Sequence, residues 1–179
     1  MKKFRFLIIL PALFLLTACS FSTNTKNAGQ DKGGVFVSSN KGDVWRQMSS
    51  IPTISANPGS IAEININKMV MDPNDSGAVY LAMEKAGLYY TYNVANGWNK
   101  ISALSSDITV NDVAIGSQNK CLIFTAMSNK LYKSIDCGRS FVQTYFDNNT
   151  GIDVLSVAID HYDNNIVYWE LNNMKKTIE

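Results

Sequence analysis

The chain has 179 residues and a formal net charge of +1, with 46% hydrophobic and 17% charged residues. This length allows one ordinary domain, and the hydrophobic content excludes a chain that is disordered throughout. The first 18 residues hold three of the 16 basic residues and none of the 15 acidic ones, so the rest is close to neutral. A near-neutral chain has no electrostatic footprint for nucleic acid, and we predict no nucleic-acid partner.

The first 18 residues have the organisation of a secretory signal. Lys2, Lys3 and Arg5 are followed by an 11-residue apolar run, 6–16, with one proline in it. The run is shorter than the ~20 residues that a membrane-spanning helix needs, and it fits the apolar region of a signal peptide. We therefore predict that residues 1–18 are a signal peptide.

The apolar run ends in Leu16-Thr17-Ala18-Cys19. This sequence resembles the lipobox of bacterial lipoproteins, in which a leucine and two small residues precede the lipidated cysteine. The resemblance implies that Cys19 becomes the mature N-terminus and carries several acyl chains such as palmitate, each buried methylene adding about 0.8 kcal/mol of membrane affinity. It implies a lipoprotein of the cell envelope, on the outer membrane or on the outer face of the cell membrane. A plain signal peptide with a chance cysteine is the alternative.

A polar segment follows the cysteine. Residues 20–32 are rich in Ser, Thr, Asn, Lys and Gly and show no hydrophobic periodicity. Such a segment cannot bury enough apolar area to offset its ordering entropy. We predict that residues 19–32 form the lipidated N-terminus and a flexible tether.

Three later segments share one sequence frame. Each has an alternating apolar strand, a Ser or Thr, an Asn or Asp two residues later, and an aromatic residue seven after the Ser or Thr. The aromatic residues lie 53 and 43 positions apart, near the ~40–50 residues of a propeller blade. The shared positions are Ser38, Asn40, Gly42 and Trp45; Thr91, Asn93 and Trp98; and Ser134, Asp136, Gly138, Ser140 and Phe141.

The frame predicts a hairpin turn. Hydroxyl, amide and carboxylate side chains can bond to nearby backbone amides, and glycine allows a positive φ at Gly42 and Gly138. The second segment has Ala95 in the glycine position. We predict that the aromatic residue opens the return strand and packs under the turn.

Apolar strand–turn–strand pairs alternate with the framed hairpins. Their mostly apolar character fits burial between neighbouring sheets. We predict that they are the inner two strands of four-stranded antiparallel blades and that the framed hairpins are the outer two. The expected fold is all-β, with residues 33–179 forming an incomplete propeller of about three to four blades. The pairs are 66–72 with 78–82, 110–115 with 121–126, and 154–159 with 165–169.

The third frame resembles the Asp-box (BNR) motif Ser-x-Asp-x-Gly-x-Thr-Trp, and residues 33–179 are similar to Asp-box β-propellers. Within that group the chain looks most like bacterial propellers similar to the photosystem II assembly factor, and like sortilin-type repeats. Sialidases and xyloglucanase-type glycosidases share the box. The resemblance implies a structural role for the box on the rim, away from the ligand face, so fold alone does not settle function.

Enzymatic chemistry finds little support in the residues. A sialidase-like site needs three arginines, and only Arg46 and Arg139 follow the leader. A xyloglucanase-like site needs two carboxylates ~5–9 Å apart. Candidates for that pair are Asp72, Asp107, Asp112, Asp153 and Asp160, of which Asp72 and Asp160 fall in equivalent turns.

Metal and triad chemistry are also disfavoured. His161 is the single histidine, and it lies in a turn between inner strands. A Ser/His/Asp triad is therefore disfavoured, and so is a histidine-rich metal site. The clusters at Asp72, Asn74 and Asp75 and at Asp160 and Asp163 have oxygen ligands but no calcium-loop spacing. We predict no catalytic residue, no metal and no cofactor.

The favoured function is a non-enzymatic, lipid-anchored envelope protein whose blades bind an envelope protein partner and assist assembly. The alternative is a carbohydrate-binding or glycosidase-type propeller, with a possible glycan ligand. Tyrosines expected to be exposed could supply either contact face, although aromatic residues in strands more often pack between blades, and both interpretations stay open. They are Tyr89, Tyr90, Tyr92 and Tyr162.

Cys121 and Cys137 are candidates for a disulfide. A two-residue turn at Ser128 and Asn129 would place Cys121 opposite position 136, one residue short of Cys137. Antiparallel neighbours lie within disulfide range, and an exported protein meets oxidising conditions. A bulge would have to correct the offset, so a disulfide and two separate thiols both remain open.

The strand count predicts an open assembly. Only outer strands precede the first full blade, and Thr177 and Glu179 occupy the first two places of a further frame. About three blades' worth of strands is fewer than the four to eight of most propellers. The chain is expected either to be a fragment of a longer protein or to complete a ring as several copies. Residues 33–179 alone are then expected to be oligomeric or aggregation-prone.

Overall fold

The computed structural model describes residues 33–53 and 59–173, all within one compact unit, Lys32–Glu179. The signal peptide, Cys19, the tether and the frame positions Thr177 and Glu179 that we predict lie outside the described residues. The regular elements in the described part are strands, apart from one 3₁₀ turn, η1 (Val94–Asn96).

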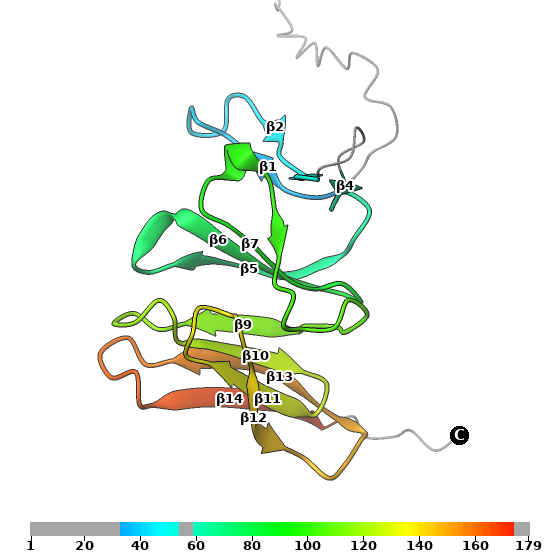
Figure 1. Cartoon of the computed structure of the whole chain (residues 1–179), viewed down its shortest axis with the longest axis vertical. Coiled ribbons are helices and arrows are strands. Elements are labelled where there is room, and N and C mark those ends of the chain that lie inside the picture. The colour runs from blue at the N-terminus through cyan, green and yellow to red at the C-terminus, as the bar shows by residue number, and fades with distance from the viewer. Residues whose placement is uncertain (1–32, 54–58, 174–179) are drawn as a thin grey trace, which may run out of the picture. The chain divides into compact units, whose positions relative to one another are not determined.

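The strands form antiparallel sheets in chain order (Figure 1). Strand β1 (Phe36–Val37) pairs with β2 (Arg46–Gln47), and β3 (Ser50–Ile51) pairs with β4 (Gly59–Ser60). Two four-stranded sheets follow, and β13 (Ile152–Ile159) pairs with β14 (Val167–Asn173). The four-stranded sheets are β5 (Ile66–Asp72), β6 (Asp75–Met83), β7 (Gly87–Thr91) and β8 (Asn99–Lys100), then β9 (Asp112–Ile115), β10 (Ile123–Met127), β11 (Lys130–Ser134) and β12 (Val142–Phe146).

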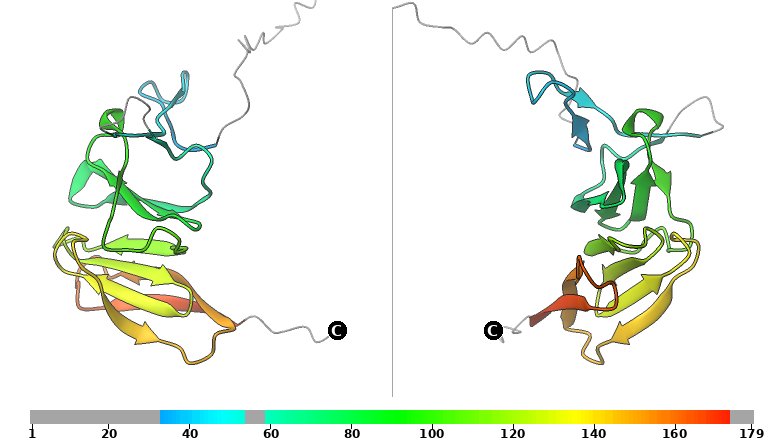
Figure 2. Two further views of the ribbon diagram at one scale, coloured as in Figure 1. Left: turned by 45° about the vertical axis from the view of Figure 1, so that its right-hand side comes forward. Right: turned by 90° about the vertical axis from the view of Figure 1, so that its left-hand side faces the viewer.

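Each four-stranded sheet has the strand order of a propeller blade, because its strands pair with their chain neighbours from inner to outer edge. Figure 2 shows the second of these sheets stacked against β13 and β14. The predicted all-β fold with four-stranded blades is therefore confirmed.

Apolar side chains fill the space between successive sheets. One cluster between the two four-stranded sheets joins Tyr80 and Ala82 to Val113 and Ile115. The cluster before it lies around Trp98, and the cluster after it joins β10 to β13. Strands β9 and β10 are thus buried on both faces, which explains their continuous apolar runs.

Two asparagines tie the inner strands together. Asn67 Nδ2 donates to the Val110 carbonyl at 2.8 Å, and Asn111 Nδ2 donates to the Val154 carbonyl at 2.8 Å. Both donors and both acceptors lie 44 residues apart. The inner parts of the last three sheets therefore repeat with a period of 44. These asparagines are not among the residues predicted above, although the repeated pairs Ile66-Asn67 and Val110-Asn111 carry the signal.

Side-chain bonds hold the turn of the third framed hairpin. The Ser134 hydroxyl donates to Asp136 Oδ1 at 2.7 Å and accepts from Gly138 N at 2.9 Å. Asp136 Oδ1 also accepts from Ser140 N at 2.9 Å. Gly138 has a φ of 82°, which a residue with a side chain rarely adopts.

The first frame has the same bonding pattern with asparagine in the acidic position. The Ser38 hydroxyl accepts from Gly42 N at 2.8 Å, and Asn40 Oδ1 accepts from Val44 N at 2.9 Å. The second frame, which lacks the glycine, forms the 3₁₀ turn η1 with Asn93 as its N-cap.

The three aromatic residues of the frames differ in burial. Trp98 is fully buried, and Phe141 packs partly buried against the cluster between the four-stranded sheets. Trp45 is 60% exposed, although its ring lies against its own turn as predicted, with Cζ2 3.7 Å from where a Cβ at Gly42 would stand. Trp98 lies between two sheets, whereas the Trp45 ring lies beside its own turn at Gly42.

The turn at Asp136 predicts a specific pH dependence of stability. Hydrogen bonds from the Ser140 hydroxyl and amide, then from Ser134, lower the pKa of Asp136 from 3.8 to about 2. A lowered folded-state pKa means that these bonds stabilise the fold above about pH 4 and that this contribution is lost as the pH falls through about 2.

We expect Asp136→Asn to flatten this acid limb, because Asn40 shows that an amide can hold the same turn. The measurement is the thermal midpoint between pH 5 and pH 2 for wild type and variant. Parallel curves for the two proteins over that interval would contradict the prediction.

Candidate functional site

The structure uses several of the candidate carboxylates to hold backbone. Asp72 Oδ1 accepts from Asn74 N at 2.8 Å, and Asp160 Oδ1 accepts from Tyr162 N at 2.8 Å. Both residues therefore stabilise turns between inner strands. Of the remaining candidates, Asp107 is exposed and Asp153 is partly buried.

Asp112 has a structural role that the sequence did not indicate. Its buried carboxylate accepts from Val157 N at 3.1 Å, across the interface between β9 and β13. Lys68 Nζ lies 4.0 Å from its other oxygen. The carboxylate thus satisfies an amide on the next sheet, and that geometry serves packing.

The acidic turn clusters bind their own backbone. Asp75 Oδ1 accepts from Gly77 N at 3.0 Å, and Asp163 Oδ1 accepts from Asn165 N at 2.9 Å. Within 33–53 and 59–173, no group of three His, Cys, Asp or Glu residues could hold a metal ion. The single histidine, His161, is exposed and lies edge-on to Tyr162, with ring centroids 5.0 Å apart.

Cys121 and Cys137 are brought together and joined as a disulfide. The strands pair as predicted, with Met127 opposite Lys130 and Ile123 opposite Ser134. The ladder ends there, and Cys137 adopts a φ of 59° while its amide donates to the Cys121 carbonyl at 3.3 Å. The left-handed residue in the turn accounts for the one-residue offset, in the place where we expected a bulge.

A hollow with tyrosine and basic side chains lies between the outer parts of the two four-stranded sheets. It has a volume of about 410 Å³. The Tyr90 and Tyr92 rings lie 5.2 Å apart in an edge-on arrangement. Burial is the main cause that raises the pKa of Tyr80 far above its usual value. The hollow is lined by Tyr80, Tyr90, Tyr92, Lys100, Ile101, Ser102, Lys120, Cys137, Gly138 and Arg139.

Tyr89 does not join this surface. Its side chain is buried in the cluster on the opposite face of the sheet, with Lys100 Nζ 5.9 Å from the ring centroid. The expectation that Tyr89 is exposed is therefore wrong, because successive residues of β7 point to opposite faces.

An apolar groove lies between the β1–β2 hairpin and the first four-stranded sheet. We call it the methionine groove. It has a volume of about 530 Å³, and its most exposed apolar side chains are Trp45, Met69 and Met71. The groove is lined by Val35, Phe36, Val37, Ser38, Lys41, Gly42, Trp45, Met69, Met71, Ser76, Val79, Val94 and Trp98.

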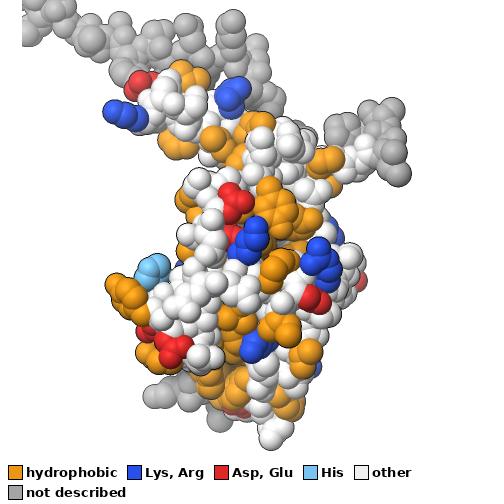
Figure 3. Space-filling model, turned by 60° about the vertical axis from the view of Figure 1, so that its left-hand side comes forward, with side chains coloured by type: hydrophobic (Ala, Val, Ile, Leu, Met, Phe, Trp, Pro, Cys, Tyr) orange, Lys and Arg blue, Asp and Glu red, His pale blue; other side chains and the backbone are white. Residues whose placement is uncertain are grey.

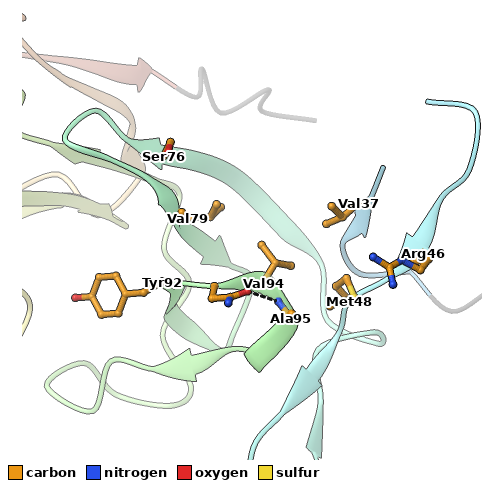
Figure 4. A pocket seen from close by; sticks show the side chains of 10 residues that line it. Val37, Arg46, Met48, Ser76, Val79, Tyr92, Val94 and Ala95 are labelled. Carbon is orange, nitrogen blue, oxygen red and sulfur yellow. Dashed lines mark hydrogen bonds between the residues drawn. The ribbon is translucent and has the colours of Figure 1, made fainter. Parts of the chain in front are cut away.

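A second hollow of about 440 Å³ continues the methionine groove outward. In Figure 4, Val37, Arg46 and Met48 come from the β1–β2 segment and face Val79 of β6 and Val94 of η1. On the face in Figure 3, hydrophobic side chains also interrupt the polar surface in several places. The grooved side thus combines a mainly apolar floor with cationic groups at its edge.

No helix within the described residues is both long and apolar enough to cross a membrane. No protein-family model matches the sequence, and no curated protein matches it.

Solved structures resemble the fold. The GH74 enzyme of Niastella koreensis has a TM-score of 0.56 and 14% identity, over 78% of this chain and 24% of that chain. An ancestral GH74 enzyme has a TM-score of 0.60 and 19% identity, over 78% and 19%. The chain therefore spans about a quarter or less of these enzymes. At such identities, the likeness places the chain among β-propeller proteins by fold.

YCF48 bound to D1 peptide is also similar, with a TM-score of 0.44 and 17% identity over 61% of this chain and 32% of that chain. This score is too low to support an inference about function.

Proposed function

We propose that this chain is a non-enzymatic, lipid-anchored protein of the cell envelope whose propeller blades bind another protein. The methionine groove carries this proposal. Trp45, Met69 and Met71 are exposed together along its length. Contiguous apolar side chains in water are unfavourable, and such patches mark protein contacts. Methionine also adapts its shape to a partner's surface.

The carboxylates support a non-enzymatic role. Asp72, Asp112 and Asp160 already accept backbone amides. A carboxylate occupied in this way is poorly placed to exchange protons with a substrate. The proposed partner is an envelope protein, and the proposed function is to form a complex with it.

The groove can be tested by exchanging one of its methionines for a charge. We expect Met71→Glu to abolish capture of an envelope protein from detergent-solubilised membranes, because the carboxylate would have to lose its water on binding. The matched control is Ile135→Glu, at an exposed position outside the groove. Equal capture by both variants and the wild type would contradict the proposal.

The lipid anchor gives a further prediction. We expect Cys19→Ala to lose fatty-acid labelling and to move from the detergent phase to the aqueous phase, because the acyl chains supply the membrane affinity. Ser20→Ala, the neighbouring control, should behave as the wild type. Labelling that persists in Cys19→Ala, or a wild-type protein that is wholly in the aqueous phase, would overturn the assignment.

A second candidate function is carbohydrate binding at the hollow that Tyr90 and Tyr92 line between the two four-stranded sheets. Tyr90 and Tyr92 present aromatic rings beside Lys100 and Arg139, and aromatic faces with adjacent polar groups suit a sugar ring. Binding on a glycan array that is lost in Tyr92→Ala but kept in Met71→Glu would favour this function over the first.

A further inference from the structure

The exposure of Met69 and Met71 is unusual among the inner strands of this chain. They are 58% and 60% exposed. The period of 44 places Val113 and Ile115 at the same two positions of the next sheet, where they are 2% and 7% exposed. These positions are therefore built to be covered by a neighbouring sheet.

In the two sheet interfaces that follow, the inner strand is covered by the same kind of residue. Tyr80 on β6 is buried in one cluster with Val113 and Ile115. Phe124, 44 residues later on β10, is buried in one cluster with Val157. An aromatic residue from the second strand of one sheet thus covers the inner strand of the next.

The third member of this aromatic series is Tyr168 on β14. It lies 44 residues after Phe124 and is 58% exposed, against 2% for Tyr80 and 7% for Phe124. The chain therefore presents an uncovered pair of receiving positions, Met69 and Met71, and an uncovered aromatic of the kind that covers them.

The paired strands are complementary as well. The sheet of β13 and β14 has the inner two strands of a blade, and the sheet of β1 and β2 has the outer two. In the complete sheets, the inner and outer pairs of strands are joined by the pairing of β6 with β7 or of β10 with β11. The two half-blades lack this pairing among the described residues. By position, β14 corresponds to β6 and β10, and β1 corresponds to β7 and β11.

We propose that the methionine groove receives the β13–β14 hairpin of a second copy of this chain, with β14 of one copy pairing antiparallel to β1 of the other. This inference rests on the proposed function, since it names the protein that occupies the same groove. The pairing places Tyr168 over Met69 and Met71 and joins the two half-blades into one four-stranded sheet.

The frames fix the register of the pairing. Ser38 corresponds to Thr91, so Val37 corresponds to Tyr90, which lies opposite Tyr80 in the first sheet. Tyr168 therefore lies opposite Val37 of the second copy. Two copies related by a two-fold axis make both contacts at once, so that each copy contributes one half of each composite sheet.

One residue of the hairpin weakens the contact. Glu170 lies where the other sheets have Ala82 and Ala126, both fully buried. A carboxylate at that place loses water when the hairpin docks. The association is therefore reversible, and Glu170→Ala should tighten it about tenfold, equivalent to about 1.4 kcal/mol.

Engineered cysteines test the register in membranes that carry the full chain. Opposed residues of antiparallel strands lie within the range of a disulfide. We expect chains with Val37→Cys and chains with Tyr168→Cys, expressed together and oxidised, to form a covalent dimer on a non-reducing gel. Val37→Cys with Ile135→Cys is the matched control. Failure to form the dimer, or equal yields in both mixtures, would overturn the inference.

Two further readouts separate this inference from the proposed function. If no covalent dimer forms but Met71→Glu still loses a captured envelope protein, the groove binds another protein and the inference fails alone. If the covalent dimer forms, and sedimentation shows that Glu170→Ala shifts the monomer–dimer equilibrium toward the dimer, while no other protein is captured, the inference stands. The groove then serves self-association. Unchanged sedimentation of Glu170→Ala would also count against the docked hairpin.

Discussion

Trp98→Ala is expected to destabilise the fold by about 3–5 kcal/mol, the usual cost of truncating a buried tryptophan. Trp98 is fully buried between the first four-stranded sheet and the segment that follows β2. Its Nε1 donates to the Met48 carbonyl at 2.7 Å, and its amide donates to the Ser50 carbonyl at 2.9 Å. The substitution leaves a large cavity and leaves the Met48 carbonyl without its side-chain donor, and both changes lower the free energy of unfolding.

Trp45→Ala is the matched control, because Trp45 holds the same place in the first frame and is exposed. Its effect should stay within about 0.5 kcal/mol. Trp98→Phe separates the two terms, since it keeps most of the packing and removes the side-chain hydrogen bond. The measurement is urea unfolding of dilute protein, with midpoints and slopes compared. Similar losses at Trp98 and Trp45 would show that the buried position has been misassigned.

Reduction of the Cys121–Cys137 disulfide is expected to lower the free energy of unfolding by about 3 kcal/mol, because the bond closes a short loop that the unfolded chain would otherwise explore. The two residues are 16 apart in sequence. The measurement compares unfolding with and without reductant. The alkylated mass of the unfolded protein checks the bond itself, since two more thiols should react after reduction.

The control is the double variant Cys121→Ser/Cys137→Ser. It should start at the stability of the reduced protein and show no further response to reductant. Equal alkylation of the wild-type protein before and after reduction would show two separate thiols, the other possibility that the sequence left open.

The sequence by itself determined the class of fold. Alternating and continuous apolar runs, separated by turns near a blade-length spacing, place β6 and β10 in buried sheets because such strands must bury both faces. It also placed the two-residue turn at Ser128 and Asn129, which sets the register of β10 and β11. These features are local, and their side-chain chemistry acts within a few residues.

The tertiary structure decided what depends on distant neighbours. Trp45 and Trp98 occupy the same place in their frames, yet only Trp98 is buried, because burial is set by the sheet that packs against it. The asparagines at 67 and 111 act on carbonyls 43 residues away. The turn that joins Cys137 to Cys121 required a left-handed residue that spacing alone did not specify. Met69 and Met71 have apolar side chains like their counterparts in the next sheet, and only the packing of sheets distinguishes a covered face from an exposed one.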